Sequence, residues 1–250
     1  MRILLSGLNG PMGAEVAKLC AEGFRGAELV AGVDYMNQTA AVPCAPDFRS
    51  AETDVDCIVD FSHHSLTAKL TAYAVARQLP LVIATTGQTE EELRTIQAAA
   101  DRVPVLLASN FSLGIVVLTA LARQAVRAFP DADIEIVETH HNRKLDVPSG
   151  TALTLAKAVQ RERPGSRLVI GRHENGKRSP SDIDIHSLRM GNIPGTHEIH
   201  IGTDTQTLVL RHEAHDRAIF AEGALAAARW IQLKAPGLYT MEQVMQDLIQ

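Results

Sequence analysis

Reactive and anion-binding groups are concentrated in one stretch of the chain, residues 138–153. It contains two adjacent histidines, His140 and His141, followed by Arg143 and Lys144. A histidine titrates near neutral pH and suits proton transfer, whereas a lysine can donate a proton or hold a carboxylate. The Pro-Ser-Gly-Thr sequence at 148–151 predicts a turn into the start of a helix, where backbone N–H groups can bind an anion. The stretch therefore predicts a site for an anionic substrate with proton-donating groups beside it.

A strand and a helix must hold this stretch in place. We expect a strand over 133–138 before it and a helix over 151–162 after it. Neighbouring residues of a strand point to opposite faces, so only one of His140 and His141 faces the site unless the strand has already ended. Adjacent histidines on a strand are poor chelators and a third ligand is missing, so we expect no metal. A solvated basic loop is the alternative interpretation.

Apolar runs alternate with helical patterns in the first half of the chain. The expected strands are 2–6, 28–33, 56–61, 79–84 and 103–108, and the expected helices are 11–22, 65–77 and 89–100. This alternation predicts an α/β fold, a Rossmann-like doubly wound parallel sheet that binds ligands at the carboxyl ends of its strands.

The pattern changes near Ser112, where we place a domain boundary. A long helix over 115–129 is followed by strand-like segments with little helix between them, at 167–171, 183–190, 197–202 and 205–212. This order predicts a second, α+β domain with a mixed or antiparallel sheet. Helices are expected again at 216–233 and 241–249.

A glycine-rich loop follows the first expected strand. Gly10 and Gly13 match the last two glycines of the dinucleotide fingerprint, while Gly7 lies one residue before the first. Asp34 follows Gly13 by 21 residues and ends the second strand, as expected of an acid that accepts hydrogen bonds from ribose. The loop therefore predicts nucleotide binding; the alternative is a glycine-rich turn with a surface aspartate.

The residues after Asp34 bear on which nucleotide is bound. Tyr35, Met36 and Asn37 offer no cation for a 2′-phosphate, and the aspartate repels one, so NADH is favoured over NADPH. Segments 85–87 and 108–112 are expected near the nicotinamide, although Thr, Asn and Ser at these positions also fit ordinary helix caps.

The composition excludes several classes of protein. Of 250 residues, 46% are hydrophobic and 21% charged, which is typical of a globular protein. A net charge of -5 with scattered Lys and Arg argues against nucleic-acid binding. No apolar run approaches the roughly 20 residues of a membrane span. Cys20, Cys44 and Cys57 fit neither a disulfide framework nor a zinc motif, so we expect a cytoplasmic protein.

The central stretch also resembles a known family. The pattern Glu-x-His-His-x-x-Lys-x-Asp-x-Pro-Ser-Gly-Thr-Ala over 138–152 is similar to the signature of the dihydrodipicolinate reductases of bacterial lysine and diaminopimelate synthesis. The resemblance extends over nearly the whole chain. Further matching segments are the glycine loop at 7–13, Asp-Phe-Ser at 60–62, Thr-Thr-Gly at 85–87, Asn-Phe-Ser at 110–112, Arg189 with Gly191, Gly195 with His197, and Arg217 with Phe220.

The resemblance implies both the reaction and the assembly. Hydride would pass from NAD(P)H to dihydrodipicolinate, a cyclic dicarboxylate, giving tetrahydrodipicolinate. The subunits would form a homotetramer. Residues 1–112 and 217–250 would form the dinucleotide-binding domain, and residues 113–216 the substrate-binding and oligomerisation domain.

The resemblance also assigns roles to residues. It places His140 and Lys144 on the family's proton-donating pair. It places carboxylate binding on His141, Lys144, Ser149, Gly150 and Thr151. With the glycine loop, it places cofactor binding on Gly7, Gly10, Pro11, Met12, Asp34, Phe61, Thr85, Gly87, Ala108, Asn110, Phe111 and Arg217. This chain departs from the family at Asp34, where many members have glutamate, and at Tyr35, where a basic residue often helps to bind NADPH.

Two other functions fit parts of the sequence. One is a Rossmann dehydrogenase of another amino or imino dicarboxylate, similar to aspartate dehydrogenase, which the dense block at 138–152 disfavours. The other is a nucleotide-binding protein without catalysis, which the presence of Asp34, His140 and Lys144 disfavours.

Overall fold

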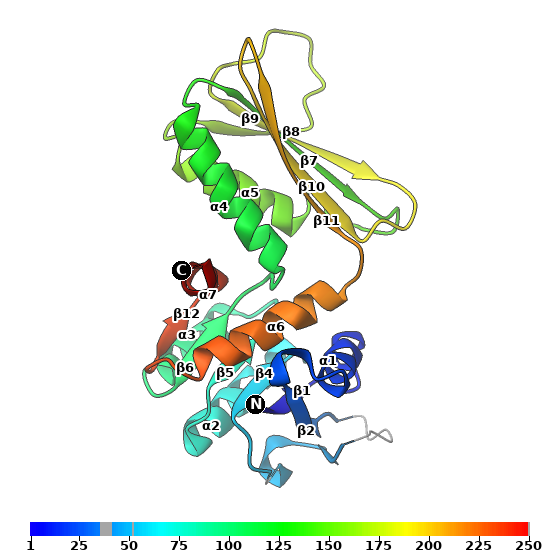
Figure 1. The fold of residues 1–250 in the computed structure, drawn as a ribbon, viewed down its shortest axis with the longest axis vertical. Coiled ribbons are helices and arrows are strands. Elements are labelled where there is room, and N and C mark those ends of the chain that lie inside the picture. The colour runs from blue at the N-terminus through cyan, green and yellow to red at the C-terminus, as the bar shows by residue number, and fades with distance from the viewer. Residues whose placement is uncertain (36–41, 52, 250) are drawn as a thin grey trace. The chain divides into compact units, whose positions relative to one another are not determined.

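The computed structural model describes residues 1–35, 42–51 and 53–249. The chain forms two compact units, each described here by itself (Figure 1). The first unit comprises Met1–Leu113 and Arg217–Gln250, and the second comprises Gly114–Asp216. No helix in the described part of the chain is long and apolar enough to cross a membrane.

A seven-stranded sheet forms the centre of the first unit, with the order β12-β6-β5-β4-β1-β2-β3. Its neighbouring strands all pair in parallel. The strands are β1 (Arg2–Ser6), β2 (Glu28–Val33), β3 (Cys44–Ala45), β4 (Cys57–Asp60), β5 (Leu81–Ile83), β6 (Pro104–Leu107) and β12 (Gly237–Tyr239). The expected Rossmann-like parallel sheet is therefore confirmed.

Helices cover this sheet. They are α1 (Pro11–Ala21), α2 (Thr67–Arg77), α3 (Glu90–Ala100), α6 (Ala218–Ile231) and α7 (Met241–Ile249). Helix α1 contacts α6, and α2 contacts α3. The contact of α6 with the β6 end is close, because a Cβ atom on Gly223 would overlap the carbonyl oxygen of Phe111. The last part of the chain adds β12 beside β6, a strand of three residues that is too short to show a strand pattern in the sequence.

Strand register brings the carboxyl ends of β1, β4 and β5 to one edge of this sheet. Ser6 pairs with Asp60, and Asp60 pairs with Ile83. Each of these strands ends there, so the loops that follow them lie side by side. The glycine loop after β1 is one of them, and this edge is where an open parallel sheet binds its ligands.

The second unit contains a five-stranded sheet with the order β11-β10-β7-β9-β8. The strands are β7 (Asp133–His140), β8 (Arg167–Ile170), β9 (Asp182–Arg189), β10 (Gly195–Gly202) and β11 (Thr207–Ala214), and the helices are α4 (Leu113–Ala128) and α5 (Gly150–Arg161). Strand β9 is parallel to β7 and β8, while β10 is antiparallel to β7 and β11, so the expected mixed sheet is confirmed.

Alternation along these strands separates a helix-facing side from an outer side. Ile134, Ile136, Ile183, Ile185 and Ile199 are buried in one core with residues of α4 and α5. Because alternate strand residues point to opposite faces, the residues between them lie on the other face. In the described part of this unit, no helix covers that outer face (Figure 1).

Candidate active site

Glu138 is the centre of a polar group on the helix-facing side of the second unit. Strand β7 continues two residues beyond its expected end, to His140, so Glu138 and His140 share one face with Ile134 and Ile136. His140 Nδ1 lies 2.5 Å from Glu138 Oε2. Arg189 approaches both carboxylate oxygens at 2.8 Å, and the Ser149 backbone N–H donates to Oε1 at 3.1 Å. We call Glu138, His140, Arg189 and His197 the inner cluster.

The surroundings of Glu138 keep it ionised. Its side chain is fully buried, and burial by itself raises a carboxyl pKa. Hydrogen bonds from His140, Arg189 and the Ser149 N–H outweigh this effect and hold the pKa of Glu138 well below its usual range. An ionised Glu138 accepts a hydrogen bond from His140 Nδ1, which orients the ring. The Nε2 atom of His140 lies against Gly195, where a Cβ atom would approach it to 3.0 Å.

His197 closes the other side of His140. The two rings meet edge to face, with centroids 5.2 Å apart. Burial and the neighbouring His140 lower the pKa of His197 to about 4, so this ring is neutral at pH 7. Its Nε2 lies 3.2 Å from Ser149 Oγ. A neutral imidazole here adds no charge that would compete with His140 for a proton.

The cation of the predicted stretch lies in the loop after β7. Lys144 Nζ lies 2.8 Å from Asp146 Oδ1, and the Lys144 N–H donates to the His141 carbonyl. A hydrogen bond from Lys144 lowers the pKa of Asp146. Arg189 also donates to the Asp146 carbonyl at 2.7 Å, so this loop is tied to the inner cluster.

His141 lies beyond the end of β7, so strand alternation does not decide its direction. Its backbone N–H donates to the Ile193 carbonyl at 2.8 Å, which fixes the loop entry. Its side chain is partly buried.

Helix α5 begins beside the same group. Ser149 is its N-cap and accepts a hydrogen bond from the Ala152 N–H at 3.2 Å. The helix starts at Gly150, whose missing side chain leaves open space, since a Cβ there would meet nothing within 4 Å. A helix start of this kind binds anions through its N–H groups and its dipole. Lys144, Ser149, Gly150 and the inner cluster therefore form an environment for a carboxylate.

The glycine loop of the first unit is built for close backbone approach. Gly7 has φ of +85°, and a Cβ there would lie 2.5 Å from the Phe61 carbonyl oxygen. A Cβ on Gly13 would overlap the Gly7 carbonyl. Pro11 starts α1, where its missing N–H costs no hydrogen bond. These glycines let the chain turn tightly at a helix start, which suits a pyrophosphate.

A cavity of about 490 Å³ opens beside this loop. The candidate residues that line it are Gly7, Gly10, Pro11, Asp34 and Phe61. Asp34 Oδ2 accepts a hydrogen bond from the Asn9 N–H at 2.9 Å, which joins the end of β2 to the loop. The residue types and the volume fit the adenosine half of a dinucleotide. Met36 and Asn37, named in the argument for NADH, lie outside the described residues.

The other cofactor candidates follow neighbouring strands of the same sheet. Among the described residues, the lining of this cavity does not include Met12, Thr85, Gly87, Ala108, Asn110, Phe111 or Arg217. Thr85 and Gly87 follow β5, Ala108, Asn110 and Phe111 follow β6, and Arg217 precedes α6. The centroids of the Phe61 and Phe111 rings lie 6.4 Å apart, so the segments that follow β4 and β6 approach each other. Asn110 Oδ1 accepts from the Ser112 N–H, consistent with the turn chemistry that its residue type favours.

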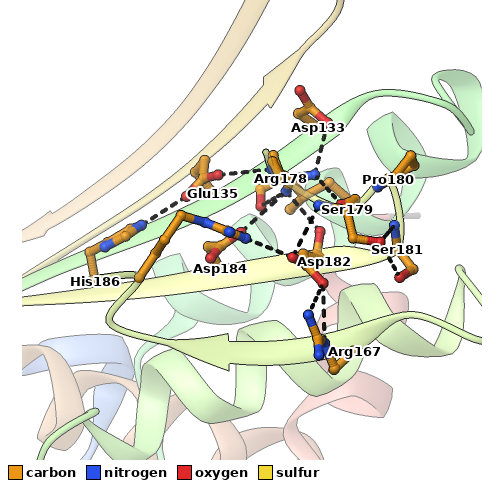
Figure 2. Close-up of polar contacts among 12 residues, drawn as sticks. Asp133, Glu135, Arg167, Arg178, Ser179, Pro180, Ser181, Asp182, Asp184 and His186 are labelled. Atoms are coloured by element: carbon orange, nitrogen blue, oxygen red, sulfur yellow. Dashed lines mark hydrogen bonds and ion pairs between the residues drawn. The ribbon is translucent and has the colours of Figure 1, made fainter. Parts of the chain in front are cut away.

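A second charged group lies on the outer side of β7 and β9 (Figure 2). This outer cluster consists of Asp133, Glu135, Arg178, Asp182, Asp184 and His186. Three potential metal ligands, Glu135, Asp184 and His186, have ligand atoms within 4.8 Å of one another. Their carboxylates are already paired, because Arg178 Nε and His186 Nε2 approach Glu135 at 3.1 and 2.8 Å, and Arg172 approaches Asp184 at 3.0 Å. Arg178 and Arg172 therefore pair with the two carboxylates of this group, while Oδ1 of Asp184 has no hydrogen-bond partner among the described residues.

Sequence reasoning assigned no role to Glu138, Arg189 or His197, although all three stand in the motifs quoted above. Their relation depends on strand register: His140 pairs with Arg189 across β7 and β9, and Glu138 pairs with His197 across β7 and β10. These residues are 49 and 59 positions apart. No local spacing signals such a pairing.

Two family models match the chain. The dihydrodipicolinate reductase N-terminus matches residues 1–111, and the dihydrodipicolinate reductase C-terminus matches residues 114–245. The two matches meet where the first unit passes into the second.

Individual relatives agree with these models. A 4-hydroxy-tetrahydrodipicolinate reductase of Caldanaerobacter subterraneus subsp. tengcongensis is 40% identical over 98% of both chains. One of Akkermansia muciniphila is 39% identical over 97% of both. A solved dihydrodipicolinate reductase from Paenisporosarcina sp. TG-14, with dipicolinate bound, superposes with a TM-score of 0.81 at 28% identity, covering 96% of this chain and 97% of that one. The chain therefore belongs to the dihydrodipicolinate reductase family, a family of oxidoreductases that use a pyridine nucleotide.

Proposed function

We propose that the protein reduces dihydrodipicolinate, formed from 4-hydroxy-tetrahydrodipicolinate, to tetrahydrodipicolinate in the synthesis of lysine and diaminopimelate. The observation that carries the proposal is the buried Glu138–His140 pair beside the start of α5. It combines an oriented imidazole with an anion-binding helix end, which is what reduction of a conjugated dicarboxylate requires. The relative from Paenisporosarcina binds dipicolinate, a planar analogue of such a ring.

The carboxylates of the substrate are held by the loop and the helix start. Lys144 and His141 supply charge or hydrogen-bond donors from the loop after β7, and Ser149, Gly150 and Thr151 supply the N-terminal end of α5. Charge-assisted hydrogen bonds of this kind are stronger than neutral ones and fix orientation. Asp146, which pairs with Lys144, is exchanged for the substrate carboxylate when the ligand binds.

The proton comes from the His140 and Lys144 pair. The nicotinamide, when bound, supplies the hydride, and negative charge then develops along the conjugated imine of the substrate. His140 presents Nε2 while Glu138 stabilises the positive charge of the ring through Nδ1. Lys144 contributes to both binding and proton supply. We expect Lys144→Ala to raise KM and lower kcat, whereas His140→Ala lowers mainly kcat.

The cofactor-binding residues lie in the first unit. We assign Gly7, Gly10, Pro11 and Met12 to the pyrophosphate and Asp34 with Phe61 to the adenosine. We assign the β5 and β6 ends, with Arg217, to the nicotinamide half, a set that comprises Thr85, Gly87, Ala108, Asn110, Phe111 and Arg217. The Asp34 carboxylate favours NADH as the preferred donor, and NADPH is the alternative.

Self-association is the remaining part of the proposal. We assign tetramer formation to the second unit, whose outer sheet face carries exposed Leu188 and Val209 among charged side chains. The free cysteines Cys20, Cys44 and Cys57 fit a reducing cytoplasm. Light scattering during gel filtration tests the tetramer, and a dimer or monomer would contradict it.

A coupled assay tests the reaction itself. Dihydrodipicolinate is generated in the cuvette by the enzyme that precedes it, and loss of NADH or NADPH absorbance is followed side by side. We expect turnover that depends on the generated substrate. Tight NADH binding without turnover would contradict the proposal, and turnover with another imino acid alone would redirect it to a different dehydrogenase.

A further inference from the structure

The adenosine cavity of the first unit contains a cation that the sequence around Asp34 does not supply. No Lys, Arg or His occurs between Asp34 and Arg49. The fold nevertheless brings two basic residues, His63 and Lys69, to the lining that contains Asp34. They come from the segment after β4, about 30 residues further along the chain. The fold therefore brings basic residues near Asp34 from a distant part of the chain.

His63 makes its hydrogen bonds within its own turn. Its Nδ1 accepts a hydrogen bond from the Ser65 N–H at 3.3 Å and lies 2.9 Å from Ser65 Oγ. The Nδ1 atom of His63 is therefore already engaged with Ser65 in the same turn. Lys69 is then the permanent positive charge among the described residues of this lining.

Nothing in the described structure engages the Lys69 ammonium group. It makes no ion pair with any described residue, and its side chain is exposed at the cavity. Asp47, the other acid of the lining, uses Oδ1 to accept hydrogen bonds from Ser50 and the Arg49 N–H. The bond from the Ser50 hydroxyl is the main cause that lowers the pKa of Asp47.

The place of Lys69 in its helix gives a second reason to look for a ligand. Lys69 is the third residue of α2, so it lies in the first turn. A cation there faces the positive end of the helix dipole and weakens the helix slightly. Its neighbours Thr67 and Leu70 are buried against the unit, whereas Lys69 serves no packing role of that kind. An anion in the cavity would compensate both the lysine and the helix end.

We infer that Lys69 binds the 2′-phosphate of NADPH, so that the cavity accepts the phosphorylated nucleotide despite Asp34. The inference rests on the proposed use of a pyridine nucleotide and modifies its preference for NADH. Asp34 already receives the Asn9 N–H on Oδ2, which partly offsets its charge. Lys69, which lines the same cavity, then supplies the attraction that a basic residue after Asp34 would otherwise provide.

Titration calorimetry of the purified full chain tests this inference without turnover. The probes are NADH, NADPH, 5′-AMP and 2′,5′-ADP, measured with wild type, Lys69→Gln and the control Lys18→Gln. Lys18 is an exposed lysine in the last turn of α1 in the same unit. We expect Lys69→Gln to weaken NADPH and 2′,5′-ADP roughly tenfold or more, the loss of one charge-assisted contact, with NADH and 5′-AMP changed less than about twofold. Lys18→Gln should change none of the four.

The same experiment distinguishes failure of this inference from failure of the proposed function. Equal weakening of NADH and NADPH would place Lys69 at the adenine or pyrophosphate and overturn the inference. Unchanged NADPH affinity would also overturn it, as would a wild-type protein that binds NADH but not NADPH; the proposed function survives both results. A wild type that binds no nucleotide would remove the proposed function and the inference together. Retained NADH binding by Lys69→Gln shows that the variant is folded.

Discussion

Two clusters of similar residues lie on opposite faces of the sheet that contains β7 and β9. Each cluster contains a glutamate, a histidine and an arginine. The inner cluster lies on the helix-facing side at the carboxyl end of β7, beside the start of α5. The outer cluster lies on the other face, towards the amino ends of the same strands (Figure 2).

The two clusters differ in how their side-chain hydrogen-bond donors are used within the protein. Arg178 of the outer cluster donates to Asp133, to Glu135 and to the backbone carbonyls of Ile134, Ser179 and Asp182. Its donors are consumed within the protein. In the inner cluster, Glu138 binds His140 through Nδ1 alone, and α5 begins next to the pair. Residue type does not distinguish the two clusters; the start of α5 beside the inner cluster does.

Removing Arg178 should have the largest effect on stability. Asp182 and Asp184 are buried, and Arg178→Ala takes away one of the arginines beside them. Loss of a partner for buried charges costs about 3 kcal/mol or more. The measurement is the free energy of opening of β9 from amide hydrogen exchange. Arg167→Ala is the matched control: its side chain is mostly exposed and pairs with the same Asp182, so we expect about 1 kcal/mol or less. Equal losses in the two variants would show that the outer cluster is not a structural clamp.

The buried His197 predicts that the stability of the second unit depends on pH through the inner cluster. Burial and the neighbouring His140 lower the pKa of His197 from 6.5 to about 4 in the folded protein. A depressed folded pKa contributes stability that is complete above 6.5 and is lost as the pH falls towards 4, because only the unfolded chain binds the proton in this window. The loss reaches at most about 3 kcal/mol.

Hydrogen exchange at β10 between pH 7 and pH 4 measures this loss. We expect His197→Gln to flatten the pH dependence, and His200→Gln, on the outer face of the same strand, to leave it unchanged. Identical profiles for wild type and His197→Gln would disprove the assignment.

The Glu138→Gln variant compares the two clusters by their effect on kcat. The amide keeps the shape but removes the charge that stabilises a protonated His140 and pairs with Arg189. Because Glu138 acts through His140, we expect kcat to fall about 100-fold, the low end of the contribution of a general acid. KM for NADH should be unchanged. Glu135→Gln on the outer face should leave kcat within about twofold; a comparable loss there would mean that the effect is structural.

Periodicity predicted most of the elements, because each depends on residues close together in sequence. The expected strand over 133–138 and helix over 151–162 agree with β7 and α5 to within two residues. The outer and inner clusters were not predictable, since both join residues that are far apart in the sequence. Arg178 reaches Asp133 and Glu135 from 45 and 43 positions away.

The site residues that lie close together in the sequence could be predicted. The site residues that only the fold brings together could not. His140, Lys144 and Ser149 stand in one dense stretch, which is why they could be named. Lys69 and Asp34 line the same cavity from different strand ends, and no spacing rule links them. The same limit applies to Glu138 and Arg189.

The central claim, that chemistry resides in the inner cluster, is tested most directly by two histidines of the paired strands. His140→Gln and His186→Gln each remove one imidazole bound to a glutamate, on the helix-facing and outer faces respectively. Single-turnover reduction of generated dihydrodipicolinate, started from the preformed nucleotide complex, compares their chemical steps. The account predicts a loss of about 100-fold or more for His140→Gln and less than about twofold for His186→Gln. A normal rate in His140→Gln, or an equal loss in His186→Gln, would contradict it.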